Sequence, residues 1–317
     1  MRDEGSQAVI RPVLGGADWR TRLSAIGAQH GGYERLNDSH AVLFTGGSET
    51  LIVTFESRET ILRDRPDEVP LGHHIARETG WSNLCVIAER ASWFREPEIY
   101  DYFDGLVEDG TFDSFDRVVF YGAGMCGYAA AAYSVTSPGS TVVLVQPQAT
   151  LDPRLAGWDH RFFEQRRLDF SSRYGFAPDM TDGADKVFVI YDPDVALDAM
   201  HAALFARTWT TLLPCRRLGR DGAQALEAMQ ITPAVIKAAG RGDLDARLFG
   251  TFYRARRNYM PYLSGLLSRL DREGRLILSG ILCRSLAERL KVGKFRARLA
   301  EIVDELARNG ERLPERE

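Results

Sequence analysis

The stretch with the clearest chemical meaning is a glycine-rich turn between an apolar run and a run of small residues. Its glycines match the spacing G-x-G-x-x-G, which lets a pyrophosphate approach the backbone at a helix N-terminus. The turn also carries a thiol near the expected helix start, where the helix dipole lowers a thiol pKa. The turn therefore predicts a ligand-binding site formed by Gly122, Ala123, Gly124, Met125, Cys126 and Gly127.

Read alone, the glycine spacing indicates a dinucleotide-dependent oxidoreductase that uses NAD or FAD. The next apolar run ends at Gln146, close to where such folds carry a ribose-binding acid, and Pro147 follows. A glutamine can donate to a ribose hydroxyl but lacks the charge-assisted acceptor of a carboxylate. This alternative stays open, although the acidic residue that would bind the ribose is missing.

The elements around the turn follow an α/β pattern. Runs such as 118–120 and 142–145 are almost continuously apolar, which is typical of parallel strands buried on both faces. Strands are expected at 41–45, 50–55, 83–88, 117–121, 140–145, 186–191 and 210–213. Helices are expected between them at 71–79, 99–107, 127–135 and 195–206. The alternation predicts a doubly wound α/β fold with a mostly parallel sheet.

From residue 222 onward the strand signal stops. Helices are expected at 223–230, 233–239, 244–269, 276–290 and 295–308. Two aromatic–arginine clusters, at 252–257 and 259–262, could stack on bases, but at helical spacing they indicate core residues with arginines reaching solvent. We therefore expect two parts, a sheet domain over 1–221 and a helical extension over 222–317 packed on it.

The chain resembles the α/β-hydrolase superfamily over roughly residues 40–221. In that family a strand–turn–helix forms the nucleophile elbow, G-x-S-x-G. The register that aligns strand and helix puts Gly122 at the first glycine, Gly124 at the nucleophile and Cys126 at the second glycine. Three expected strands precede the turn, whereas nucleotide fingerprints sit more often at a first strand. The segment 146–153, followed by Trp158 and Asp159, is also similar to the post-elbow sequence of bacterial members.

The resemblance implies a catalytic acid after strand 186–191, a histidine after strand 210–213 and an oxyanion hole near residues 54–57. Asp192 stands at the acid position, but no histidine follows His201. Arg220 lies near the base position, and an arginine stays protonated and cannot act as a general base. Because Gly124 offers no nucleophile, we expect that the protein is not a serine hydrolase.

A second alternative is a hydrolase or acyltransferase that uses Cys126, with Asp192 as its candidate acid. The elbow would then be shifted by two residues, and a base would have to come from His73, His74 or His201. Tyr128 would crowd the tight turn of that shifted elbow. The other interpretation of Cys126 is a small buried side chain that packs the turn.

The chain also resembles bacterial proteins often labelled phosphoadenosine phosphosulfate reductase. The motifs do not support that label. The sequence has no S-G-G-K-D phosphate loop, and its last cysteine, Cys283, lies in Leu-Cys-Arg rather than in E-C-G-x-H.

Composition narrows the class of protein. The four cysteines are widely separated and none lies in a CxxC pair, which argues against zinc and disulfides and fits a reducing cytoplasm. No apolar run is long enough to span a bilayer, and no signal peptide is visible. Residues 200–317 hold 22 Lys/Arg against 13 Asp/Glu, while the rest hold 18 against 31. The basic C-terminal part indicates either an arginine-rich helical surface that packs near the acidic domain of the same chain or a surface that meets an acidic protein partner. Nucleic acid is disfavoured, because no basic run of five to eight residues occurs.

The leading hypothesis is a non-hydrolytic, ligand-binding or regulatory protein on a hydrolase scaffold, without metal or cofactor. Its pocket is expected at the carboxyl ends of the strands, where residues 122–127, Asp192 and Arg220 meet. Free backbone amides at Gly124 and a cation at Arg220 predict a small anionic ligand.

Overall fold

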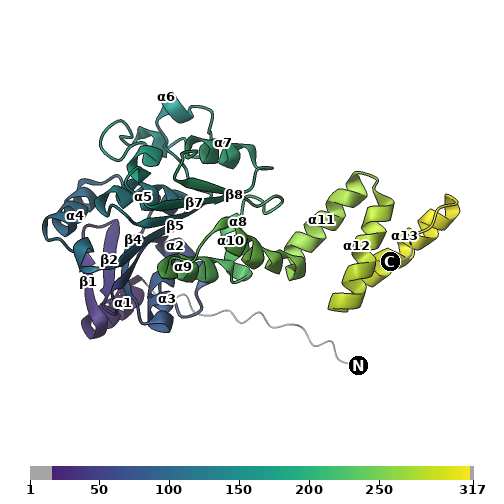
Figure 1. The fold of residues 1–317 in the computed structure, drawn as a ribbon, viewed down its shortest axis with the longest axis horizontal. Coiled ribbons are helices and arrows are strands. Elements are labelled where there is room, and N and C mark those ends of the chain that lie inside the picture. Colours follow the sequence, from purple (N-terminus) through teal and green to yellow (C-terminus); the bar gives the residue numbers. More distant parts are fainter. Residues whose placement is uncertain (1–15, 315–317) are drawn as a thin grey trace.

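The computed structural model of the protein describes residues 16–314. Its centre is one eight-stranded sheet in the order β1-β2-β4-β3-β5-β6-β7-β8 (Figure 1). The strands are β1 (Gly31–Arg35), β2 (His40–Thr45), β3 (Thr50–Ser57), β4 (Ser82–Ala88), β5 (Arg117–Ala123), β6 (Thr141–Val145), β7 (Lys186–Tyr191) and β8 (Thr210–Pro214). The pairs β1–β2 and β2–β4 are antiparallel and the other pairs are parallel. This is the strand order of the α/β-hydrolase fold, and the predicted fold class is confirmed.

All seven predicted strands form, with ends that shift by at most two residues. The eighth strand, β1, was not predicted because its sequence, GGYER, is polar and begins with two glycines. It lies at the edge of the sheet, where exposed side chains give no hydrophobic signal. Four strands therefore precede the glycine turn, not three.

Successive side chains of the central strands point to opposite faces of the sheet. Val118 and Phe120 pack into one hydrophobic cluster, and Val119 and Tyr121 pack into another. The first face is covered by α4 (Pro97–Glu108), α5 (Met125–Tyr133) and α7 (Ala196–Leu204). The second is covered by α3 (Leu71–Thr79), α8 (Gly222–Ala228), α9 (Ile231–Arg241) and α10 (Ala246–Phe252). Burial on both sides explains why these strands are apolar throughout.

Two further helices, α1 (Gly16–His30) and α2 (Arg58–Asp64), pack near the antiparallel edge of the sheet. Neither was predicted. The N-cap of α2 is Ser57, the last residue of β3, whose hydroxyl accepts from the Thr60 N–H. This short helix therefore begins directly at the end of β3.

The predicted helix over 244–269 is wrong. The chain forms α10, a 3₁₀ segment over Tyr253–Asn258, and then α11 (Met260–Arg272). Pro261 lies at the start of α11, where a proline fits a first helical turn but not a helix interior. The Tyr253 side chain is buried in the cluster beneath the sheet, and the Arg256 guanidinium lies 4.3 Å from its ring centre.

The last three helices are α11, α12 (Leu276–Leu290) and α13 (Gly293–Arg308), and they extend away from the sheet (Figure 1). They enclose a separate hydrophobic cluster that includes Leu267, Cys283 and Phe295. By contrast, α8 to α10 share the cluster on the sheet. The predicted domain boundary after residue 221 stays a prediction. The hydrophobic cluster on the sheet ends, and the cluster of the last three helices begins, near Tyr259.

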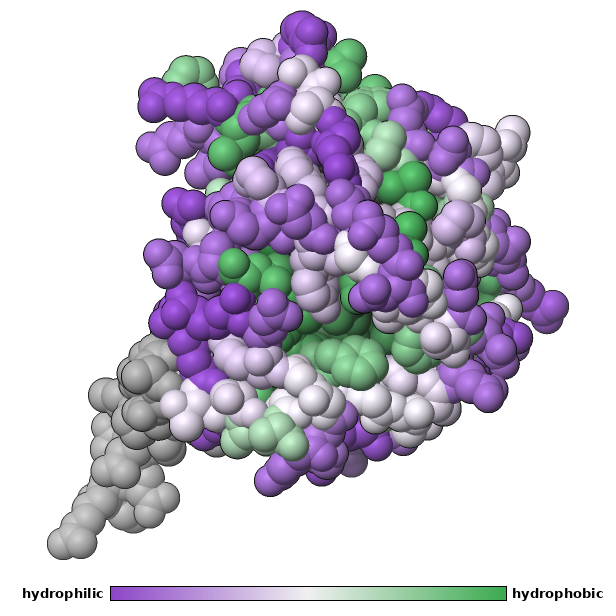
Figure 2. Space-filling view, turned by 90° about the vertical axis from the view of Figure 1, so that its left-hand side faces the viewer, coloured by the Kyte–Doolittle hydropathy of each residue, from purple (hydrophilic) through white to green (hydrophobic). Residues whose placement is uncertain are grey.

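The face of the body seen in Figure 2 is mostly hydrophilic, with hydrophobic residues in small groups. Within residues 16–314, none of the helices combines the length and the apolarity that crossing a bilayer requires.

Candidate functional site

The chain turns sharply at Gly124, between β5 and α5. Gly124 has φ 57° and ψ −123°, a conformation that other residues adopt only with strain. A Cβ placed on Gly124 would meet no heavy atom within 4 Å among the described residues. A Cβ on Gly122 would lie 2.0 Å from the Cys126 carbonyl oxygen. The turn thus has the strained backbone and open apex of a nucleophile elbow, and its apex carries no side chain.

A cavity of about 290 Å³ opens beside this apex. Of the predicted site residues, Ala123, Gly124, Cys126 and Arg220 line it. Met125 lines a neighbouring cavity of about 250 Å³, and the two cavities share Ser57 and Phe162 as a common wall. Three predicted residues line neither cavity, namely Gly122, Gly127 and Asp192.

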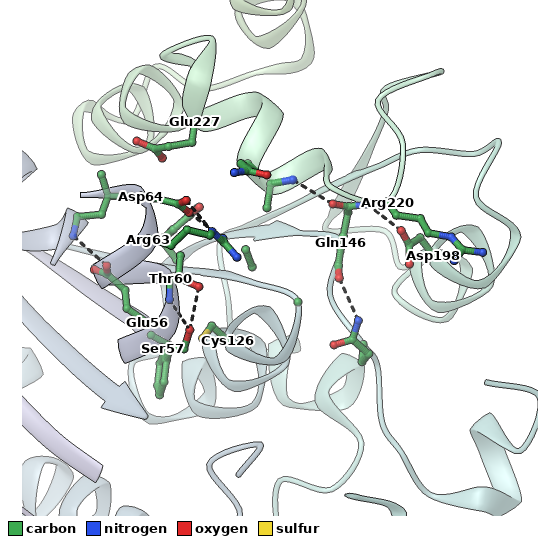
Figure 3. Close-up of a pocket in the computed structure, with 18 of the residues that line it drawn as sticks. Glu56, Ser57, Thr60, Arg63, Asp64, Cys126, Gln146, Asp198, Arg220 and Glu227 are labelled. Carbon is green, nitrogen blue, oxygen red and sulfur yellow. Dashed lines mark hydrogen bonds and ion pairs between the residues drawn. The ribbon is translucent and has the colours of Figure 1, made fainter. Parts of the chain in front are cut away.

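The cavity wall carries equal numbers of basic and acidic side chains, and most of them are paired. On one side, Arg65 contacts Glu227 at 2.5 Å and Arg63 contacts Asp64 at 2.7 Å. Figure 3 shows Arg63, Asp64 and Glu227 on this side and Gln146, Asp198 and Arg220 on the other.

The opposite side carries the remaining cations. Arg161 contacts Asp198 at 2.5 Å. No ion pair of Arg220 is found within residues 16–314. Among the described residues that line the cavity, Arg220 is therefore the one cation without an ion pair.

Gln146 connects the ends of three elements. Its Nε2 donates to Asp198 Oδ2 at 2.8 Å and to the Gly219 carbonyl at 3.0 Å, and its Oε1 accepts from the Ala223 N–H at 3.0 Å. The side chain therefore ties the end of β6 to α7 and to the loop that carries Arg220. Both N–H groups of its amide are engaged in these contacts, and its oxygen accepts one hydrogen bond.

This geometry does not fit the dinucleotide alternative. That alternative needs Gln146 to face a ribose, but both N–H groups of its amide are engaged by the chain itself. Gly122 is required by its close approach to the Cys126 carbonyl rather than by a pyrophosphate. Binding of NAD or FAD stays a prediction without a contact that supports it.

The His201 imidazole is buried in a hydrogen-bond network and does not line the elbow cavity. Its Nδ1 accepts from the Ala149 N–H at 3.1 Å, so Nε2 carries the proton and donates to Asp159 at 3.0 Å. Burial raises the pKa of Asp159, but hydrogen bonds from His201 and Arg161 outweigh burial and hold that pKa below its usual range. A pairing of Asp198 with His201, which their spacing predicts, is not found, because Asp198 binds Gln146 and Arg161.

The environment of Cys126 disfavours a thiolate. Its side chain is buried, and burial followed by the nearby Glu56 charge holds the pKa of the thiol well above its ordinary value. His73, a candidate base, is itself buried, and burial lowers its pKa to about 4. His74 is partly exposed and contacts Asp67 at 3.0 Å. These observations place Cys126 as a packing residue of the turn.

Asp192 keeps the position of a catalytic acid but binds backbone. It is 1% exposed, and its Oδ2 accepts from the Gly219 N–H at 2.7 Å while Oδ1 accepts from the Asp194 N–H at 2.9 Å. The carboxylate therefore fixes the loop immediately before Arg220, and positions that cation instead of orienting an imidazole.

The end of β3, where the resemblance implies an oxyanion hole, holds a buried carboxylate. Glu56 accepts from the Leu71 N–H at 2.9 Å, the Gly72 N–H at 3.0 Å and the Thr54 hydroxyl at 3.0 Å. It thereby satisfies the first amides of α3. This role of Glu56 could not be predicted from the sequence, because a side chain that caps a helix fifteen residues away leaves no local pattern.

One serine–histidine–carboxylate cluster does exist, away from the elbow. His40 Nε2 lies 2.7 Å from Ser92 Oγ, and His40 Nδ1 lies 3.3 Å from Glu96. Ser92 is 4% exposed, His40 is 1% exposed, and neither lines the two cavities at the elbow. The cluster joins the start of β2 to the loop after β4, where Trp93 and Phe94 both have positive φ.

All four cysteines are free and buried. Among the described residues, no group of three or more His, Cys, Asp or Glu side chains is arranged to hold a metal ion.

Comparison with known proteins gives similarity of fold only. No protein-family model matches the chain, and no curated protein matches it. Est1E from Butyrivibrio proteoclasticus has a TM-score of 0.42 at 11% identity, over 65% of this chain and 97% of that one. The capsule O-acetyltransferase of Neisseria meningitidis serogroup A, an H228A mutant in complex with CoA, has a TM-score of 0.40 at 12% identity, over 62% and 92%. Carboxyl esterase 2 from Tuber melanosporum has a TM-score of 0.40 at 13% identity, over 68% and 82%.

Proposed function

We propose that this protein binds a small anionic ligand at the elbow and does not hydrolyse it. The observation that carries the proposal is the side-chain-free apex at Gly124, which opens onto a cavity whose unpaired cation is Arg220. Contrary to the prediction, the Gly124 N–H itself is not free but donates to the Val145 carbonyl at 2.9 Å. The amides that can meet an anion are therefore the first ones of α5, which have no partner inside the helix and no side-chain cap from Gly124. Amides at a helix start and a guanidinium together suit a carboxylate or a phosphate.

The absence of an imidazole from the described cavity wall supports the non-hydrolytic part. His201 and His40 lie in buried hydrogen-bond networks, His73 is buried, and the residue near the expected base position is the always-protonated Arg220. A regulatory role would follow if ligand binding reorganises the loop around Gly219. The basic C-terminal helices stay a predicted surface for an acidic partner.

The anion-binding half of the proposal is tested with Arg220→Gln. Titration of the purified protein with succinate and with propyl phosphate should give saturable binding of at least one, weakened about tenfold by the variant, since one charge-assisted pair contributes on the order of 1.5 kcal/mol. Arg217→Gln is the matched control, because Arg217 is exposed on the same loop and does not line the cavity. Binding that ignores Arg220, or no binding at all, would contradict the proposal.

The non-hydrolytic half is tested with p-nitrophenyl acetate. We expect no turnover above the uncatalysed rate for the natural protein or for Gly124→Ser, because a serine at the apex would have no base. Turnover in the natural protein that Cys126→Ser abolishes would instead establish the cysteine enzyme.

A further inference from the structure

The buried polar groups around the cavity differ in whether the chain itself satisfies them. Glu56 accepts four hydrogen bonds from its own chain, from the Thr54 hydroxyl, the Leu71 and Gly72 N–H groups and the Cys85 thiol. Asp198 is engaged by Gln146 and Arg161, and both N–H groups of the Gln146 amide are used. Groups satisfied in this way hold the cavity in shape and have little left to offer a ligand.

Gln148 is different. It lines the cavity and is 3% exposed, yet its Oε1 has no hydrogen-bond partner within the described residues. A buried acceptor without a partner is uncommon in a folded protein and calls for a donor from water or a ligand.

The orientation of the Gln148 amide is fixed by its neighbour. Its Nε2 donates to the Gln146 carbonyl oxygen at 3.3 Å. A flipped amide would place Oε1 against that carbonyl oxygen, where two acceptors repel. The free atom is therefore the oxygen, and it can only accept.

Gln146 links the Gln148 acceptor to the loop that carries the Arg220 cation. Gln146 binds Gln148 through its backbone carbonyl and binds the Gly219 carbonyl through its side chain, one residue before Arg220. The acceptor at Gln148 and the charge at Arg220 are thus held by one rigid connection on the same side of the cavity.

We propose that the ligand of this cavity carries a hydrogen-bond donor, a hydroxyl or an amine, beside its anionic group, and that Gln148 Oε1 selects for that donor. The inference rests on the proposed function of the same cavity and names the class of ligand more narrowly, as a hydroxylated or aminated carboxylate or phosphate. A cavity of about 290 Å³ suits a small metabolite, at the low end of the ~300–1,000 Å³ typical of small-molecule sites.

The physical reason is the exchange of water for ligand. In the free protein a water can donate to Gln148 Oε1. A ligand that displaces this water without a donor of its own leaves the oxygen unsatisfied, whereas a ligand with a hydroxyl there restores the bond. Sites built in this way discriminate against analogues that lack the donor.

The test compares two matched pairs of probes by titration of the full chain. Malate and succinate differ by one hydroxyl on a dicarboxylate, and glycerol 3-phosphate and propyl phosphate differ by hydroxyls on a phosphate monoester. We expect the hydroxylated member of one pair to bind about tenfold more tightly than its partner. The pair that shows the preference identifies the anionic group as a carboxylate or a phosphate.

Gln148→Met should reduce this preference to within about twofold, mainly because the deoxy probe binds more tightly once its complex no longer leaves an acceptor unsatisfied. Gln165→Met, outside this cavity, is the control, and thermal melting verifies that each variant folds. If Gln148→Met does not fold, Gln148→Asn withdraws the acceptor while keeping an amide.

Equal binding within both pairs, with Arg220→Gln weakening every probe, would overturn this inference and leave the proposed function standing. A preference that survives Gln148→Met would also overturn it. No binding of any of the four probes would overturn the inference and the anionic ligand together.

Discussion

Two regions of this molecule divide between them what a hydrolase combines. The elbow at Gly124 has the strained backbone and an open cavity, but it has no nucleophile at its apex and no imidazole among the described residues that line the cavity. The cluster of Ser92, His40 and Glu96 has a serine, an imidazole and a carboxylate within hydrogen-bonding reach, but it is buried. Neither region holds both reactive groups and room for a substrate.

This difference indicates that the side-chain types and their spacing are not sufficient for catalysis without access for a substrate. Ser92 Oγ also accepts from the Phe94 N–H at 3.2 Å, and Glu96 accepts from Asn37 at 2.7 Å, so each member has structural bonds as well. The cluster joins the start of β2 to a loop with two residues of positive φ, while the elbow keeps the strained geometry of a reactive site, which we propose serves binding.

The largest expected effect separates the two glycines of the elbow. Gly122→Ala should destabilise the protein by about 3 kcal/mol or more, because its Cβ would overlap the backbone carbonyl of Cys126. Gly124→Ala should cost only about 1–2 kcal/mol, from positive φ alone, since its Cβ would point into open space. Urea denaturation of both variants measures the difference. Equal losses would mean that the apex is not open as described.

A smaller effect is expected at the buried cluster. Ser92→Ala should lower the free energy of unfolding by about 1–3 kcal/mol, because it leaves His40 Nε2 and the Phe94 N–H without their partner. Titration with the anionic probes should be unchanged, because Ser92 does not line the elbow cavity. Loss of binding without loss of stability would place this cluster in the functional site and contradict its description as a structural element.

The smallest effect is a pH dependence of stability at His40. Burial lowers the pKa of His40, while Glu96 raises it and Arg90 lowers it. With the folded pKa depressed, the unfolded chain takes up a proton first, so the stabilisation is present above a pH of about 6.5 and is lost as the pH falls. The slope should be at most ~1.4 kcal/mol per pH unit, and His40→Asn should flatten it. A stability that rises with acidification through this cluster would contradict the description.

Much of the fold could be predicted because the parallel strands are buried on both faces. Strands at 117–121 and 186–191 show this directly, since few alternatives explain apolar runs of that length. β1 could not be predicted, because an edge strand made of glycine and polar residues has no periodic hydrophobic signal. The break before α11 was missed because the aromatic residues on both sides continue a helical pattern.

The site was predictable where backbone conformation dictated residue type. Gly124 and Arg220, which line the elbow cavity, stand at positions that the resemblance implies, and they stay predicted site residues. Gln148 was not predicted as a site residue, because only the folded structure shows that its buried Oε1 has no hydrogen-bond partner among the described residues. Similarly, the role of Asp192 as an anchor for Gly219 depends on two segments that meet only in the folded protein.

The most direct test of the account is a search for a covalent intermediate at the elbow. The natural protein is incubated with p-nitrophenyl acetate or with a fluorophosphonate, and its intact mass and peptides are then analysed. The account predicts no time-dependent adduct on Cys126, Ser57 or Thr60, the candidate nucleophiles that line the cavity. A stoichiometric adduct on any of them, prevented by a competing anion, would show that the elbow is a catalytic centre after all.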